Sequence, residues 1–285
     1  MQPYLDDIAL KGTNDQDHLQ VLRQTFSTLR QAGVKLKREK CVCMQQSIKY
    51  LRHVLDASRL RPDPDKVEAI LNAPPTLNRE QLESFLGMVQ YYGGNIPELS
   101  TLAGPLNELR RKEVVFKWTT QQQCAFEKLK CELAGRRVLT HFNDNRKLFL
   151  ATDASEYGVG AVLFNKATPE DLSDDIKSQT AEHVISNASR TLSEAERNYS
   201  QIEKEALAII FGIKKYDKYV MGRHFTLYTD HKPLVRLFDP KQATSSTAAA
   251  RIQRWSLFLS NYDYTVEYKK GTHNSKADAL SPLPL

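Results

Sequence analysis

Residues 147–155, Lys-Leu-Phe-Leu-Ala-Thr-Asp-Ala-Ser, carry the clearest structural pattern in the chain. Their side chains fall into two alternating sets, Leu148, Leu150 and Thr152 in one and Phe149, Ala151 and Asp153 in the other. A period of two is typical of a β-strand. The carboxylate of Asp153 is therefore expected at the end of a strand.

A similar run, Phe-Thr-Leu-Tyr-Thr-Asp at residues 225–230, predicts a second strand that also ends in a carboxylate. Thr226, Tyr228 and Asp230 share one face of this strand because successive side chains alternate between faces. A sheet that contains both strands would present two acidic side chains from two strand ends.

Two further acidic residues belong to other patterns. Glu205 lies in a segment that opens with Ser193 and Glu196 in capping-box spacing, and apolar residues follow at helical spacing, namely Ile202, Ala206, Ile209, Ile210 and Ile213. Asp278 precedes Ala-Leu after a polar stretch, which places it at the start of a short C-terminal helix or turn. A helix and a terminal segment can thus bring a third and a fourth carboxylate to the same place.

Carboxylates from several elements repel one another unless a cation neutralises them, and oxygen ligands of this kind suit Mg²⁺ or Mn²⁺. Two such ions, about 4 Å apart, can activate a water and stabilise the leaving oxygen when a phosphodiester is cleaved. Any one acid at a strand end can equally be an ordinary solvated residue, so the hypothesis depends on all four lying together.

Four strings resemble the ribonuclease H domain of gypsy-type LTR-retrotransposon pol polyproteins. They are Thr-Asp-Ala-Ser-Glu-Tyr-Gly-Val-Gly-Ala-Val-Leu (152–163), the segment 188–208, Tyr-Thr-Asp-His-Lys-Pro-Leu (228–234) and Asn-Ser-Lys-Ala-Asp-Ala-Leu-Ser (274–281). The resemblance implies a mixed α/β fold in which helices flank the sheet. It also implies that Asp153, Glu205, Asp230 and Asp278 bind two metal ions.

The resemblance continues upstream and predicts three regions. Tyr-Leu-Asp-Asp at 4–7 resembles the Tyr-x-Asp-Asp turn of a reverse transcriptase palm, in which Asp6 and Asp7 would help to bind the polymerase metals. We expect a palm remnant over residues 1–61, a thumb-like helical region over 62–135 and the ribonuclease H-like domain over 136–285.

Local patterns in the first two regions predict particular elements. Leu19, Leu22, Phe26 and Leu29 indicate an amphipathic helix that Gly33 would end, and 34–41 and 48–55 look like strands. Asn78 should cap one later helix, and Thr120 with Gln123 forms a capping-box pattern for another.

Two departures from the resembled family concern polymerase chemistry. Arg52 stands where the primer-grip hairpin commonly has a glycine, and Tyr-Tyr-Gly-Gly-Asn-Ile at 91–96 replaces Tyr-Tyr-Arg followed by a bulky residue. The third metal-binding aspartate of a polymerase would lie before Tyr4, so we expect no DNA synthesis by this chain alone.

Basic residues predict a nucleic-acid partner. The 285 residues carry a net charge of +6, but residues 19–61 hold ten Lys or Arg against two acids, a local balance of +8. We expect this strip to contact phosphates, through Lys35, Lys37, Arg38 and Lys40 in particular, and Lys214, Lys215, Lys218 and Arg223 to contact the backbone of an RNA–DNA hybrid. The alternative is an ordinary solvated face rich in lysine.

Composition bounds the cellular context. The four cysteines, Cys41, Cys43, Cys124 and Cys131, have no zinc-site spacing, and the sequence shows neither a signal peptide nor a membrane-spanning run. We expect a cytoplasmic or nuclear protein that is not secreted and does not enter a membrane.

Taken with these patterns, the resemblance implies a ribonuclease H that cleaves RNA in RNA–DNA hybrids with Mg²⁺ or Mn²⁺, in a truncated reverse transcriptase. Two alternatives stay open at this stage. One is a catalytically silent protein that binds nucleic acid, and the other is a reverse transcriptase subunit that needs an upstream palm from elsewhere.

Overall fold

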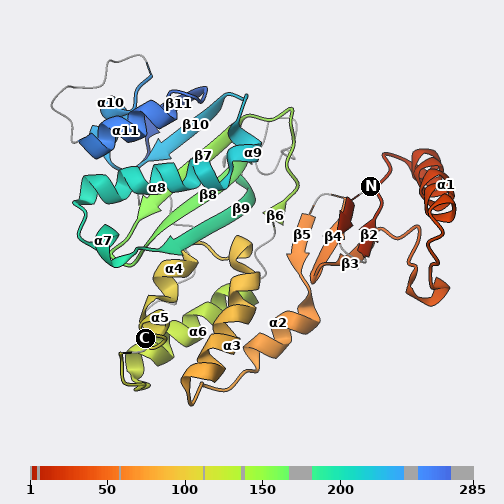
Figure 1. Cartoon of the computed structure of the whole chain (residues 1–285), viewed down its shortest axis with the longest axis horizontal. Helices are drawn as coiled ribbons and strands as arrows, with labels where there is room; N and C mark the ends of the chain where they lie inside the picture. The colour runs from red at the N-terminus through yellow and green to blue at the C-terminus, as the bar shows by residue number, and fades with distance from the viewer. Residues whose placement is uncertain are drawn as a thin grey trace, which may run out of the picture. The chain divides into compact units, whose positions relative to one another are not determined.

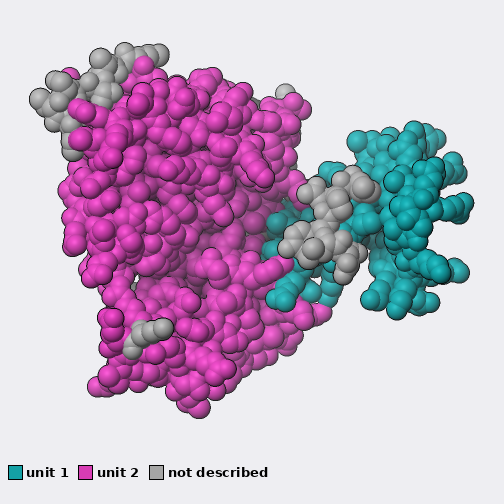
Figure 2. Space-filling view, viewed as in Figure 1, with its two compact units in different colours: residues 1–63 teal, residues 64–285 magenta. Residues whose placement is uncertain are grey.

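The computed structural model describes residues 2–4, 7–57, 59–111, 113–135, 139–166, 182–240 and 250–270. The chain divides into two compact units, Met1–Asp63 and Pro64–Leu285 (Figure 2). The further division of the second unit at residue 135, expected from the sequence, stays a prediction.

The first unit combines two small antiparallel β arrangements with one long helix (Figure 1). Its elements are β1 (Gln2–Tyr4), β2 (Asp7–Ala9), α1 (Asp15–Gln31), the 3₁₀ turn η1 (Arg38–Lys40), β3 (Ser47–Tyr50), β4 (His53–Asp56) and β5 (Arg59–Pro62). β1 pairs antiparallel with β2, and the first and last residues of the Tyr-x-Asp-Asp string, Tyr4 and Asp7, lie opposite each other.

Helix α1 confirms the helix expected around Leu19 to Leu29. The side chain of Asn14 caps it by accepting a hydrogen bond from the Asp17 amide at 2.9 Å, and the chain leaves the helix at Gly33 with φ of +69°. The strand expected over 34–41 is wrong, because that stretch is extended or 3₁₀ and exposed throughout its length. Val34 and Leu36, whose alternation suggested a strand, are 49% and 47% exposed, so they do not pack on a buried sheet face that would stabilise a strand here.

Among residues 7–57 and 59–63, no Leu, Ile, Val, Phe, Tyr or Met side chain is buried. Large apolar side chains are instead exposed, namely Ile8, Leu19, Phe26, Val34, Leu36, Val42 and Met44. A unit of this size needs buried apolar area for stability, and residues 7–57 and 59–63 do not supply a core for it.

The hairpin between β3 and β4 turns on two residues with positive φ, Leu51 at 47° and Arg52 at 57°. Two such residues in a two-residue turn are the geometry that favours Asn-Gly, because a side chain there crowds the backbone. The resembled family's glycine would therefore suit the position of Arg52 better than arginine does.

Replacing Arg52 with glycine should stabilise this hairpin. Relief of the left-handed strain is worth about 1–2 kcal/mol per residue, less the added freedom that glycine gives the unfolded chain. Amide hydrogen exchange of β3 and β4 should slow in Arg52→Gly relative to the parent. Faster exchange in the variant would show that side-chain contacts of Arg52 outweigh the strain.

The second unit begins with helices that enclose their own core. They are α2 (Pro64–Leu71), α3 (Arg79–Tyr91), the turn η2 (Gly93–Asn95), α4 (Leu99–Leu102), α5 (Gly104–Glu108) and α6 (Thr120–Ala134). Leu82, Phe126 and Leu129 are fully buried at its centre. Asn78 caps α3 as expected, whereas the capping box of α6 is Thr119 with Gln122, one residue earlier than the predicted pair.

A five-stranded mixed sheet follows, which confirms the predicted fold class. Its strands are β7 (Leu148–Ala154), β8 (Gly158–Lys166), β9 (Glu182–Thr191), β10 (Phe225–Thr229) and β11 (Tyr264–Tyr268), in the order β11-β10-β7-β8-β9. β7, β8 and β9 pair antiparallel, and β10 is parallel to both β7 and β11. The short β6 (Leu139–Thr140) contacts β9, where Thr140 donates a hydrogen bond to the Val184 carbonyl at 3.0 Å.

Helix α8 (Gln201–Lys215) crosses one face of this sheet (Figure 1). Leu150, Leu163, Ile209 and Ile213 are completely buried between them. The approach is close at Gly212, where a Cβ would lie 3.0 Å from Ala161 Cβ and 3.1 Å from Thr152 Cγ2. The smaller helices of this part are α7 (Glu194–Arg197), α9 (Asp217–Val220), α10 (Lys232–Leu237) and α11 (Ala250–Leu259).

The single helix expected from Ser193 through Ile213 is wrong in one respect. Ser193 and Glu196 do form a capping box, but α7 ends at Arg197, and α8 starts with a second capping box made by Ser200 and Glu203. The second cap lets the chain change direction before it enters the sheet-packing helix.

The opposite face of the sheet is covered at β8 and β9 by η2 and α4. Ser100 donates its amide to Ser189 Oγ at 3.0 Å, and Asn187 Nδ2 donates to the Gly94 carbonyl at 2.9 Å. A Cβ at Gly158 would lie 2.3 Å from Ser100 Oγ and 2.7 Å from the Arg190 carbonyl oxygen. Glycine is thus required where α4 meets β8.

Two glycine substitutions should therefore have opposite effects on the stability of the second unit. Gly158→Ala forces backbone apart and should cost about 1–3 kcal/mol. Gly87→Ala, in α3, should stabilise by about 0.5–1 kcal/mol, because a Cβ there meets no atom of the described residues within 4 Å. Urea unfolding measures both, and equal midpoints for the two variants would contradict the close packing of α4 on β8.

Candidate metal centre

Asp153 and Asp230 lie side by side because two strands are parallel and in register. β10 pairs with β7 so that Tyr228 lies opposite Ala151. Two residues further along, the same register brings Asp230, directly after β10, beside Asp153 near the end of β7. The expected positions of both acids at strand ends are thus those in the structure.

Glu205 reaches the same place from the beginning of α8. The Ser200–Glu203 capping box fixes where the helix starts, and the fifth helical residue is Glu205, which is only 4% exposed. Gln201 Nε2, one turn earlier, donates a hydrogen bond to Glu205 Oε1 at 2.7 Å and orients the carboxylate. Sequence reasoning missed Gln201, although the Ser-x-x-Glu spacing at 200–203 with Gln four residues before Glu205 signals it.

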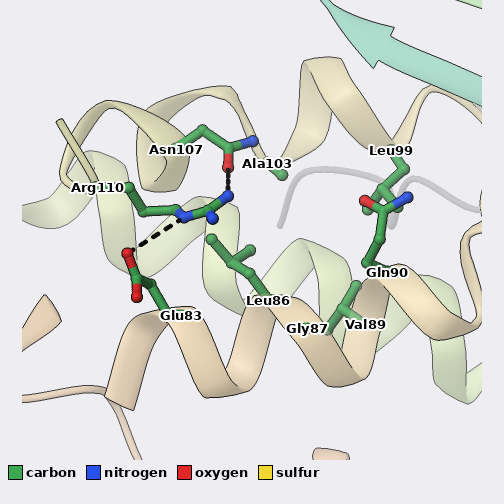
Figure 3. A pocket seen from close by; sticks show the side chains of 9 residues that line it. All are labelled: Glu83, Leu86, Gly87, Val89, Gln90, Leu99, Ala103, Asn107 and Arg110. Atoms are coloured by element: carbon green, nitrogen blue, oxygen red, sulfur yellow. Dashed lines mark hydrogen bonds and ion pairs between the residues drawn. The ribbon is translucent and has the colours of Figure 1, made fainter. Parts of the chain in front are cut away.

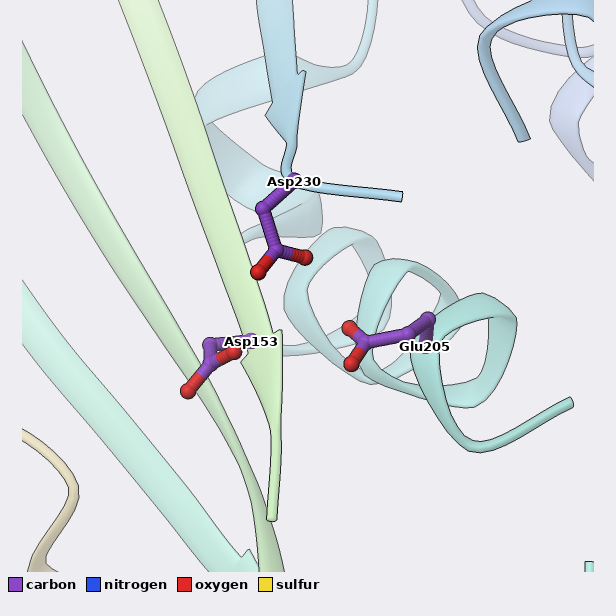
Figure 4. Close-up of side chains that lie close together, drawn as sticks. All are labelled: Asp153, Glu205 and Asp230. Carbon is purple, nitrogen blue, oxygen red and sulfur yellow. The ribbon is translucent and has the colours of Figure 1, made fainter. Parts of the chain in front are cut away.

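One carboxylate oxygen from each of Asp153, Glu205 and Asp230 lies within 4.8 Å of the others. Figure 4 shows the three side chains gathered between the ends of β7 and β10 and the first turns of α8. Asp153 and Asp230 are half-buried, so the cluster lies where solvent still reaches it.

The electrostatics of this cluster favour a bound cation. Burial, together with the charges of Asp153 and Asp230, raises the pKa of Glu205 to about 8. Burial and the neighbouring Asp230 also raise the pKa of Asp153. In the part of the chain that the structure describes, none of the three carboxylates forms an ion pair with Lys or Arg. Three converging oxygen donors without a protein cation fit Mg²⁺ or Mn²⁺.

Two of the predicted acidic residues lie outside the described residues. They are Asp278, the fourth predicted ligand, and Asp6 of the Tyr-x-Asp-Asp string. Asp7 is exposed at the start of β2. Their roles as ligands stay predictions.

The predicted nucleic-acid contacts fall into two groups. Lys35, Lys37, Arg38 and Lys40 are exposed in the first unit. Lys214 and Lys215 are exposed at the C-terminal end of α8, roughly 15 Å along the helix from Glu205 at 1.5 Å per residue. Lys218 lies on α9, and Arg223 forms an ion pair with Asp144 and lies over the Phe142 ring.

A cavity of about 160 Å³ lies among the helices α3, α4 and α5 (Figure 3). At one end Arg110 is 3.9 Å from Glu83 and donates a hydrogen bond to Asn107 at 3.2 Å. None of the three clustered carboxylates lines it. Its charged groups, Glu83 and Arg110, are paired with each other, so it lacks the chemistry of the carboxylate cluster.

Comparisons with known proteins agree with this fold. Residues 143–262 match the model of the RNase H-like domain found in reverse transcriptase, and residues 1–55 match that of reverse transcriptase, the RNA-dependent DNA polymerase. The first match contains Asp153, Glu205 and Asp230, and the second contains the Tyr-x-Asp-Asp string.

Curated relatives match along the whole chain. The retrovirus-related Pol polyprotein from transposon 297 of Drosophila melanogaster is 35% identical over 99% of this chain and 25% of its own length. The transposon Tf2-3 polyprotein of Schizosaccharomyces pombe is 33% identical over 98% of this chain and 20% of its own length. The chain thus spans about a quarter or less of the length of these polyproteins.

Solved structures confirm the fold. A foamy viral protease-reverse transcriptase in complex with RNA/DNA hybrid matches with a TM-score of 0.70 at 18% identity, over 96% of this chain and 35% of that one. The same enzyme in complex with dsDNA matches with a TM-score of 0.67 at 19% identity, over 89% of this chain and 51% of that one.

In this chain a mixed sheet and a helix bring three acids together, and a Tyr-x-Asp-Asp string precedes them in the sequence. With the two matching family models, these features place the chain in the RNase H-like and reverse transcriptase class of proteins. Within that class the two curated relatives above belong to one group, the retrotransposon polyproteins. The chain belongs to the pol polyproteins of gypsy-type LTR retrotransposons. Among the described helices, none has both the length and the apolar character that crossing a bilayer requires.

The raised pKa of Glu205 predicts how the stability of the metal-free protein depends on pH. Between the ordinary value of 4.5 and about 8, folded Glu205 keeps a proton that the unfolded chain has released. Stability from this group is therefore full at low pH and is lost as the pH rises through that window. Glu205→Gln has no such proton, so its Tm in EDTA should exceed that of the parent by more at pH 8 than at pH 5.

Thermal melting at the two pH values measures this difference, with Glu113→Gln, a change at an exposed acid outside the cluster, as the control. Added Mg²⁺ should raise the Tm of the parent at pH 8 and act weakly on Glu205→Gln. A Tm difference between Glu205→Gln and the parent that does not change with pH would show that folding does not raise the pKa of Glu205.

Proposed function

We propose that this chain carries a metal-dependent ribonuclease H activity, which cleaves the RNA strand of an RNA–DNA hybrid. The observation that supports it most directly is the convergence of Asp153, Glu205 and Asp230 within 4.8 Å of one another. Asp153 and Asp230 are half-buried, which leaves the cluster accessible to a substrate phosphate.

We assign the following roles to the residues of this chain. Asp153 with Asp278 would hold one ion and Glu205 with Asp230 the other, an assignment that follows from the family resemblance. Gln201 keeps Glu205 oriented through its 2.7 Å hydrogen bond. When bound, Mg²⁺ or Mn²⁺ lowers the pKa of a water and offsets charge on the leaving oxygen.

The proposed reaction is hydrolysis of one phosphodiester bond. A water oxygen bonds to the phosphorus, the bond from phosphorus to the 3′ oxygen breaks, and that oxygen takes a proton. The products are a 3′-hydroxyl and a 5′-phosphate. Because each carboxylate acts as a ligand, the activity should depend on all of them together.

The hybrid substrate is proposed on chemical and comparative grounds. The foamy viral enzyme of the same fold is described in complex with an RNA/DNA hybrid. Exposed lysines at the end of α8, Lys214 and Lys215, lie about 15 Å from Glu205, which suits contacts with phosphates some nucleotides away from the cut. Selection of RNA over DNA would depend on the 2′-hydroxyl and the wide minor groove.

Single substitutions of the clustered acids should abolish cleavage and spare binding. Asp153→Asn, Asp230→Asn and Glu205→Gln each delete a ligand charge, so the cleavage rate should fall by more than the roughly 100-fold that losing an outer-shell partner costs. Hybrid affinity should stay close to that of the parent, because no phosphate-binding cation is removed.

The measurement is the cleavage rate of a labelled hybrid against Mg²⁺ concentration, with hybrid affinity measured in parallel. Glu113→Gln is the control and should cleave like the parent. Equal cleavage by all three acid variants would contradict the metal centre. Binding without cleavage by the parent would replace the nuclease with a silent nucleic-acid-binding protein.

A further inference from the structure

Three aromatic rings lie side by side on the sheet face that also carries Asp153. They come from three adjacent strands, Phe149 in β7, Phe164 in β8 and Tyr228 in β10. The Phe149 ring is 5.5 Å from Phe164 and 5.7 Å from Tyr228, centroid to centroid, and its plane is nearly parallel to both, at 17° and 8°. All three side chains are buried, so the stack is a small core of its own.

The side chain of Lys166, the last residue of β8, lies over two of these rings. Its Nζ lies 4.3 Å from the Phe149 centroid and 5.0 Å from that of Tyr228, and it donates a hydrogen bond to Tyr228 Oη at 2.6 Å. β7 lies between β8 and β10 in the sheet. The Lys166–Tyr228 hydrogen bond therefore joins two strands that no ladder of backbone hydrogen bonds connects.

Lys269, just after β11, the edge strand next to β10, also contacts this aromatic stack. Its amide donates to the Thr229 carbonyl at 2.9 Å, next to Asp230, and its Nζ pairs with Glu182 of β9 at 2.8 Å. The Nζ also lies 5.2 Å from the Tyr228 centroid. Tyr228 is thus the ring at which both lysines meet.

The register of β10 against β7 matters for the carboxylates. Parallel strands are not joined by a tight turn, so buried side-chain contacts, together with the backbone ladder, specify their register. Tyr228 precedes Asp230 by two residues on the same face of β10, and Phe149 shares its face of β7 with Asp153. Any shift of the Tyr228 ring along Phe149 would change the separation of the two acids.

We propose that Lys166, through its hydrogen bond to Tyr228 and its contact with Phe149, is a positioning residue for the metal centre. It holds the end of β10 against β7, so that Asp230 stays at ligand distance from Asp153. This inference rests on the proposed metal centre but not on the identity of the substrate.

Two conservative variants remove the hydrogen bond and keep the apolar contacts. Lys166→Met retains a chain that can cover the rings, and Tyr228→Phe retains the stacked ring. Lys128→Met, at an exposed lysine of α6, is the matched control, and Lys166→Arg keeps a donor for Tyr228. The readout is the Mg²⁺ concentration that gives half of the maximal rise in Tm of the metal-free protein.

Both variants should raise that Mg²⁺ midpoint about tenfold, the lower end of what losing an outer-shell partner costs. The double variant should be no worse than either single one, because both remove the same interaction. Lys166→Arg should restore most of the affinity, and Lys128→Met should match the parent. The Tm without metal should change little in Lys166→Met and Tyr228→Phe.

Unchanged Mg²⁺ midpoints in both variants would overturn the proposal. So would a fall in the metal-free Tm with the midpoint unchanged, since that result describes a purely structural lysine. Hybrid cleavage measured on the same samples separates this inference from the proposed function. A parent that binds Mg²⁺ without cleaving, while both variants bind it more weakly, would leave the positioning role in place and remove the nuclease.

Discussion

Mutual repulsion among three acidic side chains is the constraint on which the second unit depends. Asp153, Glu205 and Asp230 approach within 4.8 Å, and burial makes their charges harder to screen. Charge held this way in a folded chain lowers its stability unless a cation joins it. Backbone pairing and capping hold the acids together against this repulsion: a parallel strand pair supplies two of them, and a helix capped at Ser200 supplies the third.

Both faces of the sheet contribute to holding the acids. On one face α8 packs closely at Gly212 and buries Leu150 with Ile213, which fixes the height and rotation of the helix that carries Glu205. On the other face α4 meets β8 at Gly158, and buried aromatic rings of β7, β8 and β10 pack against one another. The carboxylates thus lie at the end of a sheet whose strands cannot slide without breaking buried contacts.

The sequence predicts the parts of this site that follow from strand periodicity. Asp153 and Asp230 end alternating runs, and a one-residue change in either run would move its acid to the other face. The break between α7 and α8 was missed although the sequence signals it, because Ser200–Glu203 repeats the capping-box spacing of Ser193–Glu196 and so indicates a second helix start. The alternation of Val34 and Leu36 predicted a strand wrongly, because residues 34–41 are exposed and pair with no strand of the described residues. The Lys166–Tyr228 contact joins residues 62 positions apart, beyond any local pattern.

The central claim is that the three carboxylates form one metal-binding site, and calorimetric titration of Mn²⁺ into the purified protein at pH 8 tests it most directly. The parent should show saturable binding that is lost or strongly weakened in Asp153→Asn, Asp230→Asn and Glu205→Gln alike, because each removes a ligand from the same cluster. Binding of Mn²⁺ by the parent and by all three variants with the same affinity and stoichiometry would contradict the claim.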